Sequence, residues 1–489
     1  MRTMRTVVLS GFCLLSFAVP LAAQEWVERV MTEAQKPSAL QENLRRLTDE
    51  IGGRVPGTPA MDAAVKWAET AFKAAGADSV KVETFSIPQS WAEGATSVEV
   101  TSPVRFKVRA VSITWAPPLA ATRTAVVDVG EGTKADFARA GNVAGKIVLV
   151  HSDVLKTWDD LFNEYMKAPP VIAAAVQAKA AAVAFMASRE NDILYRHINT
   201  QSGRIDKIPQ LVVAREDGER IARLLAAGKT VEAEVSIPNR IGGPITTANV
   251  AAELRGSELP NEWVLLGAHL DSWELGTGAL DNGCNATLVI DALRAIKASG
   301  LKPRRSIRFV VFSGEEEGML GSRAYAEAHR AELDNAVGVL IFDEGTGPVT
   351  GFSVGGRKDI EPAVRQLIAP LQQWNATALT EDFVVGTDNL DFGFEGVPNL
   401  VANQEPANYL VNYHATSDTF DKVDFAELKK HVAMAAELSF AIADAASRLG
   451  PRQSRAAIEQ VLEQSHADEQ LKAFGLWDEW AAGKRGRAK

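Results

Sequence analysis

Cysteine is nearly absent from this sequence: Cys13 and Cys284 are its two cysteines among 489 residues. Cys13 lies in an N-terminal apolar segment that we expect to be removed, so no disulfide can form within one mature chain. A disulfide-stapled scaffold is therefore excluded. With 46% apolar and 23% charged residues, the composition instead supports one large hydrophobic core or two to three smaller ones.

The sequence also lacks a long basic run. Its 62 acidic residues outnumber its 52 lysines and arginines, which gives a formal net charge of −10. Neutralising a phosphate backbone requires clustered Lys and Arg, so nucleic acid is excluded as the main ligand. The basic ending GKRGRAK is too short to change this conclusion.

Apolar runs long enough to span a membrane are missing after residue 23. Residues 1–23 carry Arg2 and Arg5, continue with VVLSGFCLLSFAVPLAA and end on small residues before Gln24, which is typical of a cleaved secretory signal. A membrane anchor is the alternative, and the polar, glycine and proline interruptions of the run disfavour it. We expect a secreted or periplasmic protein with no membrane segment after cleavage, whose net charge becomes −12 because two arginines leave.

The pattern of apolar residues divides the rest of the chain into four parts. Residues 24–117 begin with two stretches of helical periodicity, and residues 118–238 mix short apolar strands with Ala-rich helices as a self-contained module. Residues 239–450 alternate strands and helices, which predicts an α/β fold with a mostly parallel central sheet and helices on both faces. Residues 451–489 are typical of an amphipathic helix followed by a tail.

Ionisable side chains stand where the apolar runs of residues 239–450 stop. Ligands of such sheets bind beyond the carboxyl ends of the strands, so we expect these side chains to meet at one edge. They are His269, Asp271, Glu315, Glu316 and Asp343. Burying several carboxylates without a cation is costly, so the pattern favours a metal site.

Each candidate has a chemical role that its local sequence suggests. Asp271 lies two residues after His269 and shares its side of an extended chain, so it can orient the imidazole. Asp281, in the turn ALDNGCN before a helix, is open enough to bridge two metal ions. The neighbours Glu315 and Glu316 face different ways, so one can bind metal while the other acts on the metal-bound water.

Asp343 in LIFDEG and His414 in NYHATSDT complete the candidate set. Zinc takes imidazole and carboxylate ligands, and a two-metal site needs one carboxylate that reaches both ions. Each residue alone also has a structural explanation: a histidine is often hydrogen-bonded in the core, an acidic stretch is often solvated, and a strand-end Asp often caps a turn. The joint arrangement favours the metal site.

The order of the segments HLD, LDNG, GEEEGMLGS, FDEG and YHATSDT resembles the di-zinc aminopeptidase and glutamate carboxypeptidase family. The spacing is most similar to plasma glutamate carboxypeptidase-like members, with twelve residues from His269 to Asp281 and thirty-four from there to Glu315. The segment RLTDEIGGRVPGTPAM is similar to the opening of that family. Residues 118–238 resemble its inserted protease-associated domain.

The resemblance implies a zinc exopeptidase, an aminopeptidase or dipeptidase, that acts on short peptides or dipeptides and holds two Zn²⁺ ions per chain. It implies that His269 and Asp343 hold one zinc ion, that Glu316 and His414 hold the other, and that Asp281 bridges them. It also implies a cis peptide bond between Asp281 and the next residue, and a homodimer.

The resemblance further implies that Glu315 is the general base and acid. Asp388, in GTDNLDFGFEGVP, would support the metal shell or the substrate, with the capping of a turn as its structural alternative. Tyr409 and Tyr413 are candidates for stabilising the oxyanion, or for packing in the core. Asn282 stands where the family often has a second acidic residue, so the local charge differs from the family pattern.

Two other classes of protein share parts of this pattern. A single-zinc acyltransferase similar to glutaminyl cyclases would keep the sheet and several ligands, and the inserted module disfavours it. A binding protein similar to transferrin receptors would keep the architecture without hydrolysis, and the presence of every ligand residue disfavours it.

Overall fold

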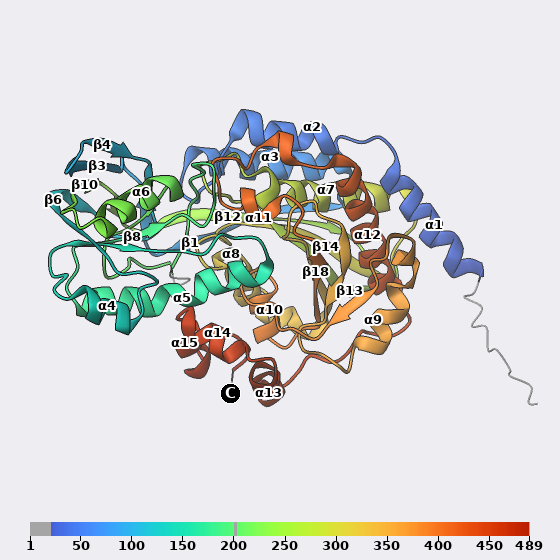
Figure 1. The fold of residues 1–489 in the computed structure, drawn as a ribbon. Coiled ribbons are helices and arrows are strands. Elements are labelled where there is room, and N and C mark those ends of the chain that lie inside the picture. The colour runs from blue at the N-terminus through green and yellow to red at the C-terminus, as the bar shows by residue number, and fades with distance from the viewer. Residues whose placement is uncertain (1–20, 200–202, 489) are drawn as a thin grey trace, which may run out of the picture.

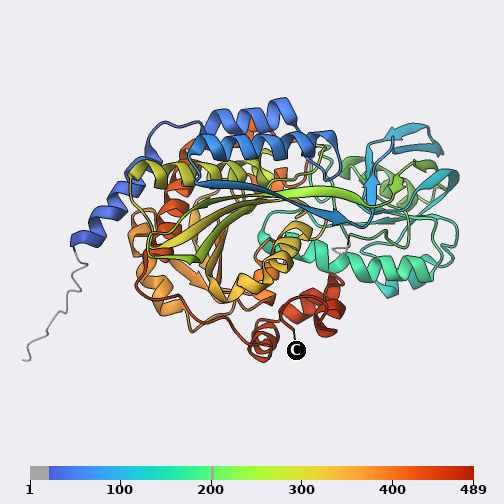
Figure 2. The same ribbon diagram turned by 180° about the vertical axis from the view of Figure 1, so that it is seen from behind.

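The computed structural model describes residues 21–199 and 203–488. The secretory signal is expected over residues 1–23, and residues 1–20 of it lie outside the described residues. Two units lie side by side, and the C-terminal helices lie against both of them (Figures 1 and 2). Within the described part of the chain, no helix is both long and apolar enough to span a membrane.

The larger unit is built around an eight-stranded sheet in the order β1-β12-β14-β13-β15-β18-β16-β17. In that order the strands are β1 (Ser79–Ile87), β12 (Ile245–Leu254), β14 (Arg305–Phe312), β13 (Leu259–His269), β15 (Ala336–Ile341), β18 (Asn399–Gln404), β16 (Val349–Ser353) and β17 (Ala378–Thr380). The four middle strands, from β14 to β18, run parallel to one another. Towards the edges, β1–β12, β12–β14 and β16–β18 pair antiparallel, so the expected α/β fold is confirmed with a more mixed sheet.

The middle strands of the sheet are buried on both faces because they are apolar at most positions. Along β13, Val264 and Leu266 point into one core, and Trp263 and Leu265 point into the other. The first core is covered by α1 (Leu21–Gln35), α2 (Leu40–Arg45), α3 (Pro59–Ala75), α7 (Cys284–Ser299), α9 (Glu361–Leu367) and α12 (Phe425–Asp444). The second is covered by α8 (Leu320–Ala328) and α10 (Leu390–Phe394).

The smaller unit has its own eight-stranded sheet, in the order β4-β3-β10-β6-β7-β8-β9-β5, and its own apolar clusters. Its strands are β4 (Phe106–Val108), β3 (Ser97–Ser102), β10 (Glu232–Ile237), β6 (Leu119–Asp128), β7 (Ile147–Val150), β8 (Ala182–Met186), β9 (Gln210–Val213) and β5 (Ala110–Ser112). Its helices are α4 (Lys134–Ala140), α5 (Trp158–Gln177) and α6 (Arg215–Ala226). Because β3, β4 and β5 precede residue 118, this sheet takes in strands from before the expected start of the module. The short pair β2 (Ser90–Ala92) and β11 (Arg240–Gly242) lies where the chain enters and leaves it.

The end of the chain forms three short helices, α13 (Arg455–Gln464), α14 (Ala467–Ala473) and α15 (Trp477–Ala481), in place of one amphipathic helix and a tail. Their apolar faces form one cluster with α10, and Tyr165 and Met166 of α5 pack against it. The C-terminal helices therefore join the two units.

Glu437 of α12 is a fully buried acid. Its side chain is fully buried, and neither carboxylate oxygen has a hydrogen-bond partner among the described residues. Burial raises the pKa of Glu437 well above its ordinary value. The native state therefore keeps a proton that the unfolded chain releases above pH 4.5, so this residue lowers stability as the pH rises.

We expect Glu437→Gln to unfold like the parent near pH 4.5 and to become progressively more stable than it above that pH. The gain should grow by up to about 1.4 kcal/mol per pH unit. Thermal unfolding of both proteins from pH 4.5 to 8 measures it, with the exposed Glu463→Gln as the control. A difference in the free energy of unfolding between the two proteins that does not change with pH would show that Glu437 is ionised in the folded protein.

Candidate metal centre

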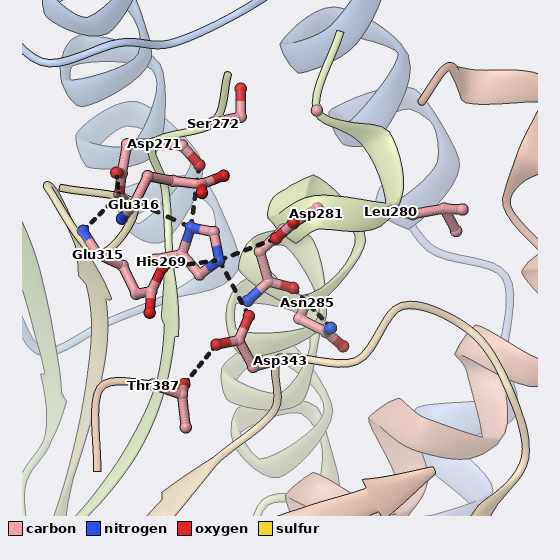
Figure 3. A network of polar contacts seen from close by, with 12 residues as sticks. His269, Asp271, Ser272, Leu280, Asp281, Asn285, Glu315, Glu316, Asp343 and Thr387 are labelled. Carbon is pink, nitrogen blue, oxygen red and sulfur yellow. Dashed lines mark hydrogen bonds and ion pairs between the residues drawn. The ribbon is translucent and has the colours of Figure 1, made fainter. Parts of the chain in front are cut away.

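The candidate site lies at the edge of the central sheet where the parallel strands end. His269 is the last residue of β13, Glu315 and Glu316 follow β14, and Asp343 follows β15. Asp281 lies in the helical turn Ala279–Gly283, between β13 and α7. Parallel strands bring their carboxyl ends to one edge, which is why residues far apart in the sequence meet there (Figure 3).

One group of possible ligands surrounds His269. Its Nε2 atom lies 2.9 Å from Oδ1 of Asp343 and 3.2 Å from Oδ1 of Asp281. The Glu315 carboxylate is further away, with Oε2 at 4.0 Å from the same nitrogen. His269, Asp281 and Asp343 therefore form a compact set of three, and Glu315 stands beside it.

A second group surrounds His414, which follows the short helix α11 (Tyr409–Asn412). Its Nε2 atom lies 2.8 Å from Oε2 of Glu316 and 3.4 Å from Oδ2 of Asp281. Asp281 thus offers one oxygen to each histidine. In each group, the three possible ligand atoms lie within 4.8 Å of one another.

Both imidazoles are held with Nε2 facing the carboxylates. The Nδ1 atom of His269 lies 3.0 Å from the carbonyl oxygen of Asp271, and Nδ1 of His414 lies 2.9 Å from that of Arg196. A carbonyl oxygen only accepts hydrogen bonds, so Nδ1 donates and the Nε2 lone pair is free for a cation.

Asp271 orients the imidazole through its main chain, whereas the sequence suggested its side chain. Its carboxylate oxygen lies 3.7 Å from Nδ1 of His269. The same carboxylate accepts hydrogen bonds from the backbone N–H groups of Glu315, at 3.3 Å, and Glu316, at 3.2 Å. Asp271 therefore positions the loop that carries both glutamates.

The turn that carries Asp281 is held by two residues that sequence reasoning missed. The Asp418 carboxylate accepts hydrogen bonds from the backbone N–H groups of Ala279, Leu280 and Asp281, at 3.1, 2.7 and 3.2 Å. The buried Arg54 guanidinium donates to the carbonyl oxygens of Leu270, at 2.6 Å, and of Thr277 and Gly278, both at 2.8 Å. Both residues stand in segments already singled out, YHATSDT and RLTDEIGGRVPGTPAM, which was the available signal.

The peptide bond between Asp281 and Asn282 is cis, as expected. The Asn282 side chain does not extend the ligand set. It donates a hydrogen bond to the carbonyl oxygen of Phe342, at 3.1 Å, and accepts one from Asn285, at 2.6 Å. The amide at this position ties the turn to the end of β15.

Asp388 is buried near the site but forms no hydrogen bond with the ligand groups. Its neighbour Thr387 instead donates a hydrogen bond to Oδ2 of Asp343. Tyr409 donates to the carbonyl oxygen of Asp343 at 3.2 Å. Tyr413 stacks on the His414 ring, with centroids 3.7 Å apart.

Several carboxyl groups are buried close together in the site, so they cannot all be ionised unless a cation is bound. Burial, with added repulsion from neighbouring carboxylates, raises the pKa of Glu315 and of Glu316 well above its ordinary value, although His269 opposes this shift. Asp281 Oδ2, Glu316 Oε1 and Asp343 Oδ1 are buried without a hydrogen-bond partner among the described residues. Cations would satisfy these oxygens, so the residues present fit a metal centre.

A cleft of about 650 Å³ opens over the two groups. His269, Asp281, Glu315, Asp343 and His414 are among the residues that line it. A small ligand in this cleft would therefore contact the carboxylates and the imidazoles directly.

Residues 249–439 match the model described as "Peptidase family M28", and this segment contains every candidate ligand. This segment belongs to peptidase family M28. Carboxypeptidase Q of Rattus norvegicus is 29% identical over 414 residues, which cover 82% of this chain and 85% of that protein. The probable leucine aminopeptidase 2 of Arthroderma benhamiae is 30% identical over 286 residues, or 55% of this chain and 51% of that protein.

Solved structures agree with this M28 membership. A peptidase M28 precursor from Shewanella amazonensis SB2B is 25% identical, with a TM-score of 0.81 over 88% of this chain and 99% of that one. The aminopeptidase from Aneurinibacillus sp. strain AM-1 has the same fold, with 21% identity, a TM-score of 0.62 and coverage of 88% and 98%. The family and the enzyme class expected from the sequence, a metallo-exopeptidase, are confirmed.

Proposed function

We propose that this M28 protein is a secreted or periplasmic, zinc-dependent aminopeptidase or dipeptidase that hydrolyses short peptides with two zinc ions. The observation that carries the proposal is the sharing of Asp281 between two ligand groups, beside a glutamate that belongs to neither. The leader over residues 1–23 supports the location, and the smaller unit supports the expected protease-associated insertion.

His269 and Asp343 would hold one zinc ion, Glu316 and His414 would hold the other, and Asp281 would bridge them. When bound, zinc supplies Lewis acidity, which makes water more acidic and polarises a carbonyl group. The chain contributes fixed ligands: both imidazoles are held at Nδ1 by carbonyl oxygens, and the Asp281 turn is held by Asp418.

Glu315 would move the proton that hydrolysis requires. Its carboxylate takes a proton from the water that attacks the scissile carbonyl carbon, and then gives that proton to the leaving amine nitrogen as the C–N bond breaks. Cations in the two ligand groups favour the ionised form that accepts the proton. Tyr409 and Tyr413 line the cleft and are candidates for donating a hydrogen bond to the oxyanion.

The rival classes are less well supported by the geometry. A single-zinc acyltransferase would need one ligand group, whereas two groups of three possible ligands are present. A non-catalytic binding protein would not need either ligand group. It would also not need Glu315, the acid beside them that belongs to neither group.

Metal analysis of the purified protein should find two zinc ions per chain. Dipeptides and aminoacyl-anilides should be hydrolysed, a chelator should abolish the activity, and added zinc should restore it. A zinc-free protein that cleaves nothing would favour the binding-protein class. Cyclisation of peptides with N-terminal glutamine would favour the acyltransferase.

The smaller unit contributes to the second ligand group through Arg196. Its carbonyl oxygen accepts from His414 Nδ1, and its N–H donates to the His414 carbonyl oxygen at 2.8 Å. The Arg196 side chain is fully buried and pairs with Glu93 and with Glu274, at 2.5 and 2.6 Å. This side chain therefore fixes the carbonyl that orients His414.

We expect Arg196→Met to bind one of its two zinc ions about 10- to 100-fold more weakly than the parent. Competition titration with a coloured chelator measures both affinities. Arg123→Met, which breaks an exposed ion pair in the same unit, is the control. Unchanged affinity for both ions in Arg196→Met would contradict this role.

A further inference from the structure

A hollow of about 700 Å³ lies in the smaller unit, between its sheet and α5. None of the candidate metal ligands, all of which the structure describes, lines this hollow. Trp158 and Leu161 of α5 line the cleft over the metal centre, so the same helix forms a wall of both spaces. The apolar wall of the hollow includes Val150 of β7, Phe185 of β8, Val212 of β9, and Ala168 and Val171 of α5.

His197 brings an unpartnered polar atom to the wall of this hollow. Its side chain is 4% exposed, and its Nε2 atom has no hydrogen-bond partner among the described residues. The rings of Tyr165 and Tyr195 hold the imidazole in place, with centroids 4.6 and 6.0 Å from its own. Burial lowers the pKa of His197 to about 4, so the ring is neutral at ordinary pH and can accept a hydrogen bond. Buried polar atoms nearly always have a partner, which leaves this nitrogen for a ligand that donates.

The charged side chains of the wall have an excess of acid. Lys167 is the single lysine or arginine among the described residues of the wall, and it pairs with Asp153 at 2.7 Å. The Glu164 carboxylate pairs at 3.1 Å with an arginine outside the wall. Glu131 and Asp160 line the hollow as well, without a basic partner in its wall. Their charges favour a cation over an anion or a neutral molecule.

We propose that this hollow is a second ligand site, separate from the candidate metal centre, for a small molecule that combines an apolar body with an ammonium group. The ammonium group donates hydrogen bonds and supplies the positive charge that the wall lacks, and the apolar body covers the aliphatic and aromatic side chains. The proposal does not depend on the proposed function, because binding can be measured in a protein that cleaves nothing.

Isoamylamine is a suitable probe, because it has both features and no bond that a peptidase cleaves. Ligand-observed NMR titration of the purified protein should show saturable binding. The affinity should be about 10-fold higher than for isoamyl alcohol, which lacks the charge, and at least about 10-fold higher than for methylamine, which lacks the apolar body. Absence of saturable binding would overturn the proposal, and equal affinity for the alcohol would overturn the choice of an ammonium group.

Ala168→Leu tests the place of binding, because it puts a larger side chain into the hollow. It should weaken isoamylamine binding by at least about 10-fold. Ala173→Leu, at an exposed position of the same helix outside the hollow, is the control and should bind like the parent. Binding that survives in Ala168→Leu and disappears when a chelator removes zinc would place the amine at the metal centre and contradict the proposal.

Glu131→Gln tests the charge, and it decides the question if Ala168→Leu does not fold. It should weaken isoamylamine binding by about 5-fold and leave the affinity for isoamyl alcohol unchanged. Glu234→Gln, which removes an exposed acid of the same unit outside the hollow, is the control. Equal affinity for isoamylamine in Glu131→Gln and the parent, or an equal loss in Glu234→Gln, would contradict the role of the wall.

Discussion

Glu315→Gln should lower kcat for dipeptide hydrolysis by about 10²- to 10⁴-fold while the zinc content stays at the parent level. The amide keeps the size of the side chain but cannot take the proton of the attacking water. Glu315 belongs to neither ligand group, and its nearer oxygen is 4.0 Å from His269 Nε2. The loss should therefore appear in kcat, with metal binding preserved.

Glu317→Gln is the matched control for this change. Glu317 is another buried acid of the same loop, and it lies outside both ligand groups. Its variant should keep kcat near that of the parent. Activity close to the parent in Glu315→Gln would refute the role of Glu315, and loss of zinc from that variant would make it a ligand instead.

Asp281→Ala should lose both zinc ions and all measurable activity. This residue alone is shared by both ligand groups, with Oδ1 near His269 and Oδ2 near His414. Removing its carboxylate takes one ligand from each zinc ion. Without the cations, the remaining carboxylates repel one another. The effect should exceed that of any variant confined to one group.

His414→Ala provides the comparison, because it removes a ligand from the second group only. It should retain about one zinc ion per chain, whereas Asp281→Ala should retain none, and elemental analysis after gel filtration distinguishes the two. Two zinc ions retained in Asp281→Ala would show that this residue is no bridge. Equal losses in both variants would show that the two ions bind only as a pair.

The site residues that the sequence predicted lie mainly at the ends of the parallel strands. An apolar run that stops at a histidine or a carboxylate predicts both a buried strand and a polar group at its carboxyl end. His269 and Asp343 follow this rule at β13 and β15, and Glu315 and Glu316 follow it at β14. The carboxyl ends of adjacent parallel strands share one edge, so order along the chain was enough to bring these residues together.

Hydrogen bonds between segments far apart in the sequence could not be predicted in this way. Asp418 and Arg54 each form three of these hydrogen bonds around the Asp281 turn, and Thr387 forms one with Asp343. These hydrogen bonds join distant segments, so the local sequence around each residue did not indicate its partners. The role of Asp271 illustrates the same limit. Its spacing predicted a neighbour of His269, but the path of the loop decided that the carbonyl oxygen, rather than the carboxylate, meets the imidazole.

The sequence by itself determined the α/β alternation, the family and the residue types of the candidate metal centre, because these depend on local periodicity and on side-chain chemistry. Only the tertiary structure decided that Asp281 faces both histidines, that Arg196 of the smaller unit orients His414, and that Phe474 of the C-terminal segment lines a hollow with Glu315 and Glu316. Those relations arise from packing between segments far apart in the chain. Packing is set by the shape of the whole core, which no local pattern encodes.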